Sequence, residues 1–272
     1  MDYIFPTVTG NDKQFNSFSL GNFNIIFNGF LWNGIRNNDF CELYIWTAYE
    51  KKQGGANMDQ PIIEVEHITK TYGTATVLND VSVSFNRGTV TGIIGRNGSG
   101  KTVLLKCILG LTPVTSGNIT VNGRRVGKEI DFPESIGFIV NTPGFLPGYS
   151  GYANMKFLAA INSKAKKDDI IRAMETVGLE PSNRKKVGEY SLGMKQRLAI
   201  AQAIMEDPQI LVLDEPMNSL DNSGVVEMRR LFSGMAQQGK TILITSHNHE
   251  DIEVLCDVVY EMDHGSLKRE GD

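Results

Sequence analysis

A glycine-rich stretch from Gly95 to Thr102 reads GRNGSGKT and matches the pattern G-x-x-x-x-G-K-[ST]. Glycines allow backbone conformations that a Cβ atom would forbid, so successive N–H groups can converge on an anion. Lys101 would reach the β- and γ-phosphates of a nucleotide, and the Thr102 hydroxyl would ligate the Mg²⁺ that bridges them. The stretch therefore predicts a phosphate-binding loop (P-loop); the alternative is a glycine turn before an ordinary helix. We expect nucleotide contacts from Gly95, Arg96, Asn97, Gly98, Ser99, Gly100, Lys101 and Thr102.

Two adjacent carboxylates follow an apolar run in the segment ILVLDEP, residues 210–216. Asp214 suits coordination of Mg²⁺, either directly or through one of its waters. Glu215 could orient or deprotonate a water that attacks the γ-phosphate. Adjacent acids after a strand are common in loops, so this pair indicates a nucleotide site only in combination with the P-loop upstream.

The elements that must position these residues can be read from the periodicity of apolar side chains. We expect strands over residues 62–68, 77–85, 90–94, 118–121, 135–140, 209–213, 241–245 and 258–262, and helices over residues 152–161, 168–177, 193–205, 223–238 and 250–256. The alternation in the last third predicts a parallel α/β core, in which ligands bind at the carboxyl ends of the strands. The P-loop and the two carboxylates would meet at that edge.

Composition narrows the function classes. The 272 residues are 41% hydrophobic and 21% charged, which is typical of a soluble globular protein. A formal charge of -4 gives no reason to expect nucleic acid as a partner. Cys41, Cys107 and Cys256 form no CxxC pair, which favours a reducing compartment and no zinc site. No apolar window is long enough to cross a bilayer and no secretory signal begins the chain, so we expect any membrane role to act through a partner.

Residues 1–57 differ from the rest, with nine asparagines, seven of the thirteen phenylalanines and both tryptophans but no sustained period. We interpret them as an extension outside the fold, consistent with an upstream start codon, and residues 58–272 as the folded domain. The alternative is that IIFNGFLW, residues 25–32, contacts a membrane surface or a partner, although this stretch has no basic face.

Five motifs in a fixed order now carry a resemblance: GRNGSGKT, YSLGMKQR (residues 190–197), ILVLDEP, NSLD (218–221) and TSH (245–247). Together they resemble the ATP-binding subunit of an ABC transporter, from Ile62 to Lys268. The resemblance implies an α/β P-loop NTPase fold with a mixed sheet core, an antiparallel β subdomain and a helical subdomain at about residues 142–195. SLGMKQR in place of the commoner SGGQ form is similar to ATPase subunits of drug and peptide-antibiotic exporters or immunity systems.

The resemblance also implies roles for single residues. Tyr72 matches the aromatic residue that stacks on adenine, although it also reads as a strand tyrosine with a wet hydroxyl. Ser191 and Gly193 match the signature that binds the γ-phosphate held by the opposite protomer. Asp221 matches the loop that crosses between protomers, and reads equally well as a helix N-cap. His247 matches the switch histidine, which would hold Glu215 and the attacking water in register.

Asn141 departs from the family pattern, which usually has a glutamine that contacts Mg²⁺ and water. Asparagine keeps the amide but is one methylene shorter, roughly 1.5 Å of reach. We still expect Asn141 to act as a catalytic and metal-site residue. The segment after it carries Phe145, Leu146 and Tyr149, which either contact a partner or pack inward, with equal weight for both.

The sequence therefore predicts an ATPase that uses ATP and Mg²⁺, closes as a sandwich of two protomers, identical or different, and drives separate transmembrane permease subunits from the inner face of the cell membrane. The cargo expected from the resemblance is an antibiotic-like or amphipathic molecule moved outward. One alternative is a soluble, non-transport ABC ATPase that acts on ribosomes or DNA. Another is a module that senses ATP and hardly hydrolyses it.

Overall fold

The computed structural model describes residues 24–27, 30–33, 61–140, 144–162 and 164–271. The chain divides into two units, Met1–Gly55 and Ala56–Asp272. In the first unit β1 (Asn24–Phe27) and β2 (Phe30–Asn33) pair antiparallel, with Ile25 opposite Trp32. Strands of four residues are too short to give a sustained period. The predicted boundary after residue 57 lies outside the described residues.

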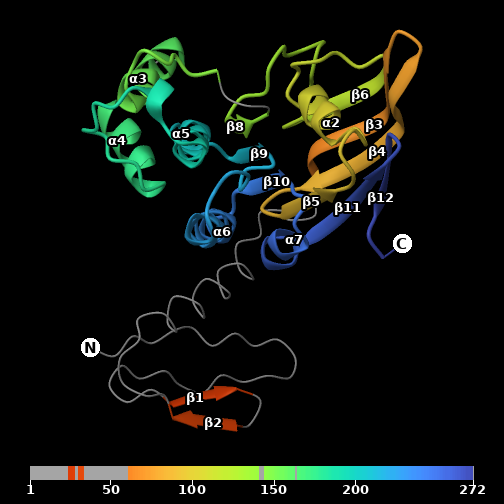
Figure 1. The fold of residues 1–272 in the computed structure, drawn as a ribbon. Coiled ribbons are helices and arrows are strands. Elements are labelled where there is room, and N and C mark those ends of the chain that lie inside the picture. The colour runs from red at the N-terminus through yellow and green to blue at the C-terminus, as the bar shows by residue number, and fades with distance from the viewer. Residues whose placement is uncertain (1–23, 28–29, 34–60, 141–143, 163, 272) are drawn as a thin grey trace. The chain divides into compact units, whose positions relative to one another are not determined.

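A six-stranded sheet forms the centre of the second unit, in the order β12-β11-β5-β10-β9-β8 (Figure 1). Five of its strands run parallel and β12 pairs antiparallel with β11. This arrangement confirms the predicted mixed sheet. The strands are β5 (Val90–Ile94), β8 (Ile136–Ile139), β9 (Ile210–Asp214), β10 (Thr241–Thr245), β11 (Val258–Asp263) and β12 (Ser266–Arg269).

Both faces of this sheet are buried, which explains the continuous apolar runs of its central strands. Along β9, Leu211 and Leu213 join one core cluster, whereas Ile210 and Val212 join another, as the two-residue period of a strand requires. The first cluster includes residues of α5 (Leu192–Ile204) and α6 (Asn222–Gln237), and the second includes α2 (Lys101–Ile108). A further helix, α7 (His249–Leu255), follows β10.

A four-stranded antiparallel sheet has the order β4-β3-β6-β7 and packs its core against α2 (Figure 1). Its strands are β3 (Pro61–Tyr72), β4 (Ala75–Asn86), β6 (Ser116–Val121) and β7 (Arg124–Arg125). β4 alternates buried and exposed residues from Leu78 onward except at one irregular step, as its sequence predicts. The two-residue β7 and the edge strand β12 were not predicted, since both are short and polar.

The helical part predicted from residue 142 onward contains α3 (Gly151–Asn162), α4 (Lys167–Thr176), the 3₁₀ turn η1 (Val187–Glu189) and the start of α5. α3 and α4 contribute Met155, Ile170 and Met174 to the same core cluster as α5. The structure thus has the three parts that the resemblance implied: a mixed core, an antiparallel β part and a helical part. Across the described residues, none of the helices combines the length and the apolar character needed to span a bilayer.

Candidate active site

The P-loop joins the end of β5 to the first turn of α2. Gly95 has φ +143°, and a Cβ atom there would lie 2.2 Å from the carbonyl oxygen of Met262, so the backbone could not pass β11 with a larger residue. Gly98 has φ +81° with open space beside it. Arg96, Asn97 and Gly98 are exposed. The loop therefore presents its outer backbone to solvent and its base to the sheet.

Lys101 lies at the N-terminus of α2 and is only 6% exposed. Its Nζ donates to the carbonyl oxygens of Gly95 at 2.6 Å and Arg96 at 3.1 Å, so the ammonium is held over the loop. The first turn of α2 contains no acidic residue, and the positive end of the helix dipole is left for an anion. The buried Ser99 hydroxyl is an orphan, because no partner for it exists among the residues that the structure describes. These features fit a polyphosphate.

Asp214 is the last residue of β9, and its carboxylate accepts hydrogen bonds from the P-loop helix α2 and from the neighbouring strand β10. The Thr102 hydroxyl donates to its Oδ2 at 2.6 Å, and the Thr245 hydroxyl donates to its Oδ1 at 2.7 Å. β9 and β10 are parallel with Asp214 opposite Thr245, which brings these oxygens to one edge of the sheet. Hydroxyl and carboxylate oxygens are the ligands that Mg²⁺ prefers. Thr102 and Asp214 therefore fit the metal predicted from the sequence.

Glu215 adopts a left-handed backbone with φ 52°, an uncommon conformation for a residue with a side chain. Its N–H donates to the hydroxyl and the carbonyl of Thr245, at 3.0 and 3.2 Å. Its Oε2 lies 2.6 Å from Nδ1 of His247, a hydrogen bond in which the imidazole N–H donates to the carboxylate. The structure thus brings the predicted base and the predicted switch histidine together.

Ser191 and Asp221 both cap helices in this protomer. The Ser191 hydroxyl accepts from the N–H of Met194 at 3.1 Å at the start of α5. Oδ1 of Asp221 accepts from the N–H of Gly224 at 2.9 Å, and this bond together with the Ser223 hydroxyl lowers the pKa of Asp221. The N-cap alternative for Asp221 is therefore correct within the protomer, and a contact across a dimer is compatible with it.

Gly193 lies in the first turn of α5, near the loop that follows Glu215. A Cβ atom on Gly193 would be 3.0 Å from the carbonyl oxygen of Ser219. The signature segment and the NSLD segment are therefore neighbours in the fold. Asn141 lies outside the described residues, so its predicted role stays a prediction.

Tyr72 ends β3 and is 50% exposed, as a stacking platform for a base must be. The ammonium of Lys70 lies 4.8 Å from the centroid of its ring and donates to the carbonyl of Pro113 at 2.6 Å. Sequence reasoning missed Lys70, and also Thr245, which contacts both carboxylate residues. Thr245 could have been found from the sequence, because it is a hydroxyl residue at the end of the strand predicted to lie beside ILVLDEP.

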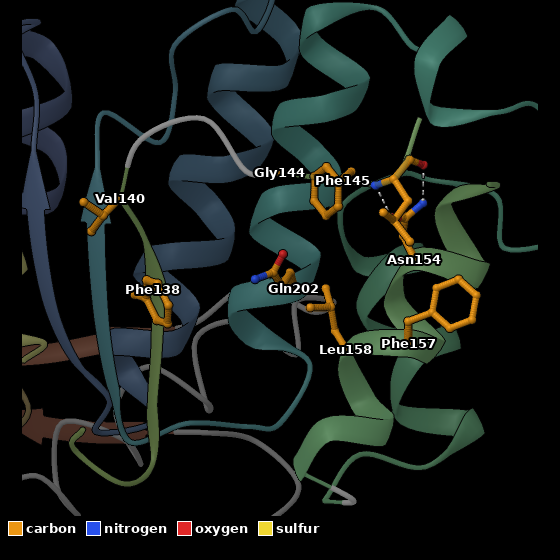
Figure 2. A pocket seen from close by; sticks show the side chains of 9 residues that line it. Phe138, Val140, Gly144, Phe145, Asn154, Phe157, Leu158 and Gln202 are labelled. Carbon is orange, nitrogen blue, oxygen red and sulfur yellow. Dashed lines mark hydrogen bonds between the residues drawn. The ribbon is translucent and has the colours of Figure 1, made fainter. Parts of the chain in front are cut away.

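A separate cavity of about 310 Å³ lies between β8 and the helices α3 and α5 (Figure 2). Asn154 shapes its rim by accepting from the N–H of Leu146 at 2.7 Å and donating to its carbonyl at 3.1 Å. Phe145 is half-buried against the core, so of the two alternatives it packs inward. Leu146 is 48% and Tyr149 51% exposed, and the Tyr149 ring packs edge-on against Phe157. The cavity is lined by Phe138, Val140, Gly144, Phe145, Leu146, Asn154, Phe157, Leu158 and Gln202.

Comparison with known proteins agrees with this geometry. A sequence profile of the family described as "ABC transporter" matches residues 78–218. An uncharacterized ABC transporter ATP-binding protein of Bacillus subtilis, YybJ, is 46% identical over 207 residues, covering 76% of this chain and 95% of YybJ. The bacitracin transport ATP-binding protein BcrA of Enterococcus faecalis is 41% identical, over 77% of this chain and 68% of BcrA.

Solved structures show the same fold. The ATP-binding cassette MJ0796, in a dimeric post-hydrolysis state bound to ADP and Pi, superposes with a TM-score of 0.70 at 20% identity, over 76% of this chain and 97% of that one. The P-loop, the carboxylates at the end of β9 and the matches to the family profile and to the relatives lead to one assignment. The chain belongs to the ABC transporter family and is an ATP-binding, ATP-hydrolysing subunit of that family.

Proposed function

We propose that this subunit hydrolyses MgATP as a sandwich dimer and drives the outward transport of an antibiotic-like, amphipathic molecule through separate permease subunits. The observation that carries the proposal is the 2.6 Å contact between Glu215 and His247 at the sheet edge where Thr102 meets Asp214. A base, a partner that orients it and a set of oxygen ligands beside a P-loop are the parts that phosphoryl transfer to water requires.

Each residue of the site then has a chemical task. The P-loop N–H groups and the Lys101 ammonium hold the β- and γ-phosphates. Thr102 and Asp214 would hold Mg²⁺, which would supply positive charge against the phosphates. Glu215 accepts a proton from the attacking water. His247 fixes the orientation of the Glu215 carboxylate through its Nδ1. Tyr72 stacks on the adenine ring, and the amide of Asn141 would contribute to the contacts with the water and the metal.

A second protomer would complete each site. Ser191 and Gly193 lie at the N-terminus of the 13-residue helix α5, whose dipole favours an anion. We assign that anion as the γ-phosphate bound by the opposite protomer, with Asp221 in the loop that crosses between the two. The partner is a second ATP-binding protomer, identical or different.

The permease would dock at the cavity between β8, α3 and α5. Leu146, Tyr149 and Phe157 leave apolar surface exposed around it, and exposed apolar clusters on a soluble domain mark partner contacts. Docking there places the subunit on the inner face of the cell membrane. The similarity to BcrA, whose name refers to bacitracin transport, supports a peptide-antibiotic cargo. The net charge of -4 gives no reason to propose nucleic acid as a partner.

An affinity pull-down tests this function. Tagged protein is recovered from detergent-solubilised membranes of its source, with and without ATP, and its partners are identified by mass spectrometry. A stoichiometric polytopic membrane protein is the expected result. Ribosomal or other soluble partners without a membrane protein would contradict the transporter proposal.

A matched pair of variants tests the docking surface in the same experiment. Leu146→Asp at the cavity places a charge among apolar contacts and should abolish recovery of the membrane protein. Val254→Asp on α7, at a side chain 55% exposed, should leave recovery unchanged. Equal recovery with both variants would remove the cavity from the interface.

A further inference from the structure

A buried ion pair joins α6 to α7 next to the loop that carries His247. Arg229 on α6 is 8% exposed and Asp251 on α7 is 3% exposed. Nε and one terminal nitrogen of Arg229 both donate to Oδ1 of Asp251, at 2.9 and 2.6 Å. The other terminal nitrogen contacts Glu250 at 2.9 Å. Each of the three guanidinium nitrogens of Arg229 thus contacts a carboxylate of α7.

The second oxygen of Asp251 reaches the loop that carries His247. Oδ2 accepts from the Ser246 hydroxyl at 2.9 Å, and the oxygen of that hydroxyl accepts from the N–H of Asn248 at 3.0 Å. Ser246 and Asn248 flank His247. One buried hydroxyl therefore ties the main chain on both sides of the histidine to Asp251.

The other end of the loop is fixed by Thr245, whose hydroxyl donates to Asp214 and accepts from the N–H of Glu215. The His247 side chain itself is 64% exposed, so few packing contacts hold the imidazole in place. A polar cavity of about 90 Å³ also borders the loop; among its lining residues are Ser246, His247 and Asp251. Hydrogen bonds, more than close packing, set where His247 lies.

A buried ion pair is weak evidence for stability, because desolvation of two charges offsets their attraction. Its best-attested use is to fix one geometry among several. Among the described residues, Oδ2 of Asp251 contacts one residue of this loop, Ser246, which is the neighbour of His247. The Asp251 carboxylate therefore connects α6 to the loop that carries His247.

We propose that Arg229, Asp251 and Ser246 are positioning residues that hold His247 against Glu215 for ATP hydrolysis. Arg229 orients Asp251, Asp251 orients the Ser246 hydroxyl, and this hydroxyl fixes the main chain from which the imidazole reaches the carboxylate. The inference rests on the proposed roles of Glu215 and His247.

Ser246→Ala removes the hydroxyl and keeps the volume almost unchanged. In the full chain, kcat for ATP should fall by about 10-fold to 100-fold, since a small misplacement of a catalytic group has that effect. The KM for ATP should stay within about twofold, because the P-loop is untouched. Ser246→Thr keeps the hydroxyl and should restore most of kcat. The control Ser182→Ala loses a hydrogen bond from an exposed serine to Glu180 and should match the wild type.

A double-mutant cycle with His247→Ala separates positioning from a general structural effect. If Ser246 acts through the histidine, Ser246→Ala has no further effect on the residual kcat of His247→Ala. An equal fractional loss in both backgrounds, or wild-type kcat in Ser246→Ala, would overturn the inference. Arg229→Lys keeps the charge but loses the two-nitrogen contact, and should lower kcat without changing KM even if Ser246→Ala unfolds.

Failure of the proposed function gives a different pattern. If the wild-type chain together with its partner protomer shows no ATPase activity in the presence of MgATP, the proposed chemistry itself is contradicted. Wild-type activity that persists in His247→Ala overturns both the role of the histidine and the positioning inference. Activity lost in His247→Ala and retained in Ser246→Ala refutes the positioning inference alone.

Discussion

Gly137 on β8 lies close against the C-terminal end of α5, and adding one methyl group there should destabilise the fold. Gly137 is buried and pairs with Leu211 on β9. A Cβ atom on it would lie 1.9 Å from the carbonyl oxygen of Ala203 and 2.9 Å from Cγ of Pro208. The first is a backbone atom near the end of α5, so no side-chain rotation can relieve the contact.

The size of the effect follows from this distance. The separation must widen from 1.9 Å to at least 3.0 Å, the lower limit for real Cβ contacts. Moving the end of α5 by about an ångström in a close-packed core costs about 1–3 kcal/mol. For a unit of this length, that corresponds to a decrease in Tm of about 2–12 °C. Gly137 has no positive φ, so the predicted loss comes from space and not from backbone strain.

Gly234→Ala on α6 is the matched control, because the substitution is the same and the surroundings differ. A Cβ atom on Gly234 meets nothing within 4 Å. Alanine in a helix interior is favoured over glycine by about 0.5–1 kcal/mol, so Tm should rise by about 1–4 °C. Thermal unfolding of the full chain, followed by circular dichroism or calorimetry, measures both variants. An unchanged or higher Tm for Gly137→Ala would refute the close approach of β8 and α5.

The remaining predictions concern the site, the thiols and the extension. Glu215→Gln should reduce ATP hydrolysis by about 10² or more and trap an ATP-bound dimer on gel filtration; unchanged turnover would remove Glu215 from its role. Asn141→Gln should keep or raise ATPase activity, and a large loss would show that the shorter side chain is required. Burial raises the pKa of Cys107 to about 11 and that of Cys256 to about 12, so both thiols stay neutral at pH 8. Their alkylation, followed by peptide mass spectrometry, should be about 100-fold slower than that of an exposed thiol, and rapid labelling in the native protein would contradict the burial of Cys107 and the partial burial of Cys256. A chain that starts at Met58 should match the full chain in melting temperature and activity, whereas a lower Tm would show that the extension packs.

The parts of the site that could be predicted lie within short stretches of sequence. The P-loop and ILVLDEP each place their polar residues directly after a buried strand, so one local pattern specifies both the element and the chemistry. Parallel pairing of β9 and β10 then brings Asp214 and Thr245 together. This pairing could be expected because strands and helices alternate in that part of the chain.

Contacts between side chains far apart in the sequence could not be predicted in this way. Arg229 and Asp251 lie on two amphipathic helices, where charged residues usually face water, and nothing local distinguishes them from solvated neighbours. The same holds for Lys70, which lies in the part of β3 beyond residue 68, where the predicted strand ends. Gly137 reads as a weak strand residue until the path of α5 is known.

β5, the strand that leads into the P-loop, has a consequence for the synthesis of the protein. It lies between β10 and β11, so both of its hydrogen-bonded neighbours come from residue 241 onward. The N–H of Gly265 donates to the carbonyl of Ser99 as well, which supports the loop from the C-terminal hairpin. Between Thr102 and Thr241 the ribosome adds 139 residues, which takes about 7–30 s at typical rates. During that time the nascent chain carries the complete motif without the strands that hold it. Nucleotide binding therefore has to wait until β10 and β11 have been made, and a chain that stops before residue 243 should not bind nucleotide although every P-loop residue is present.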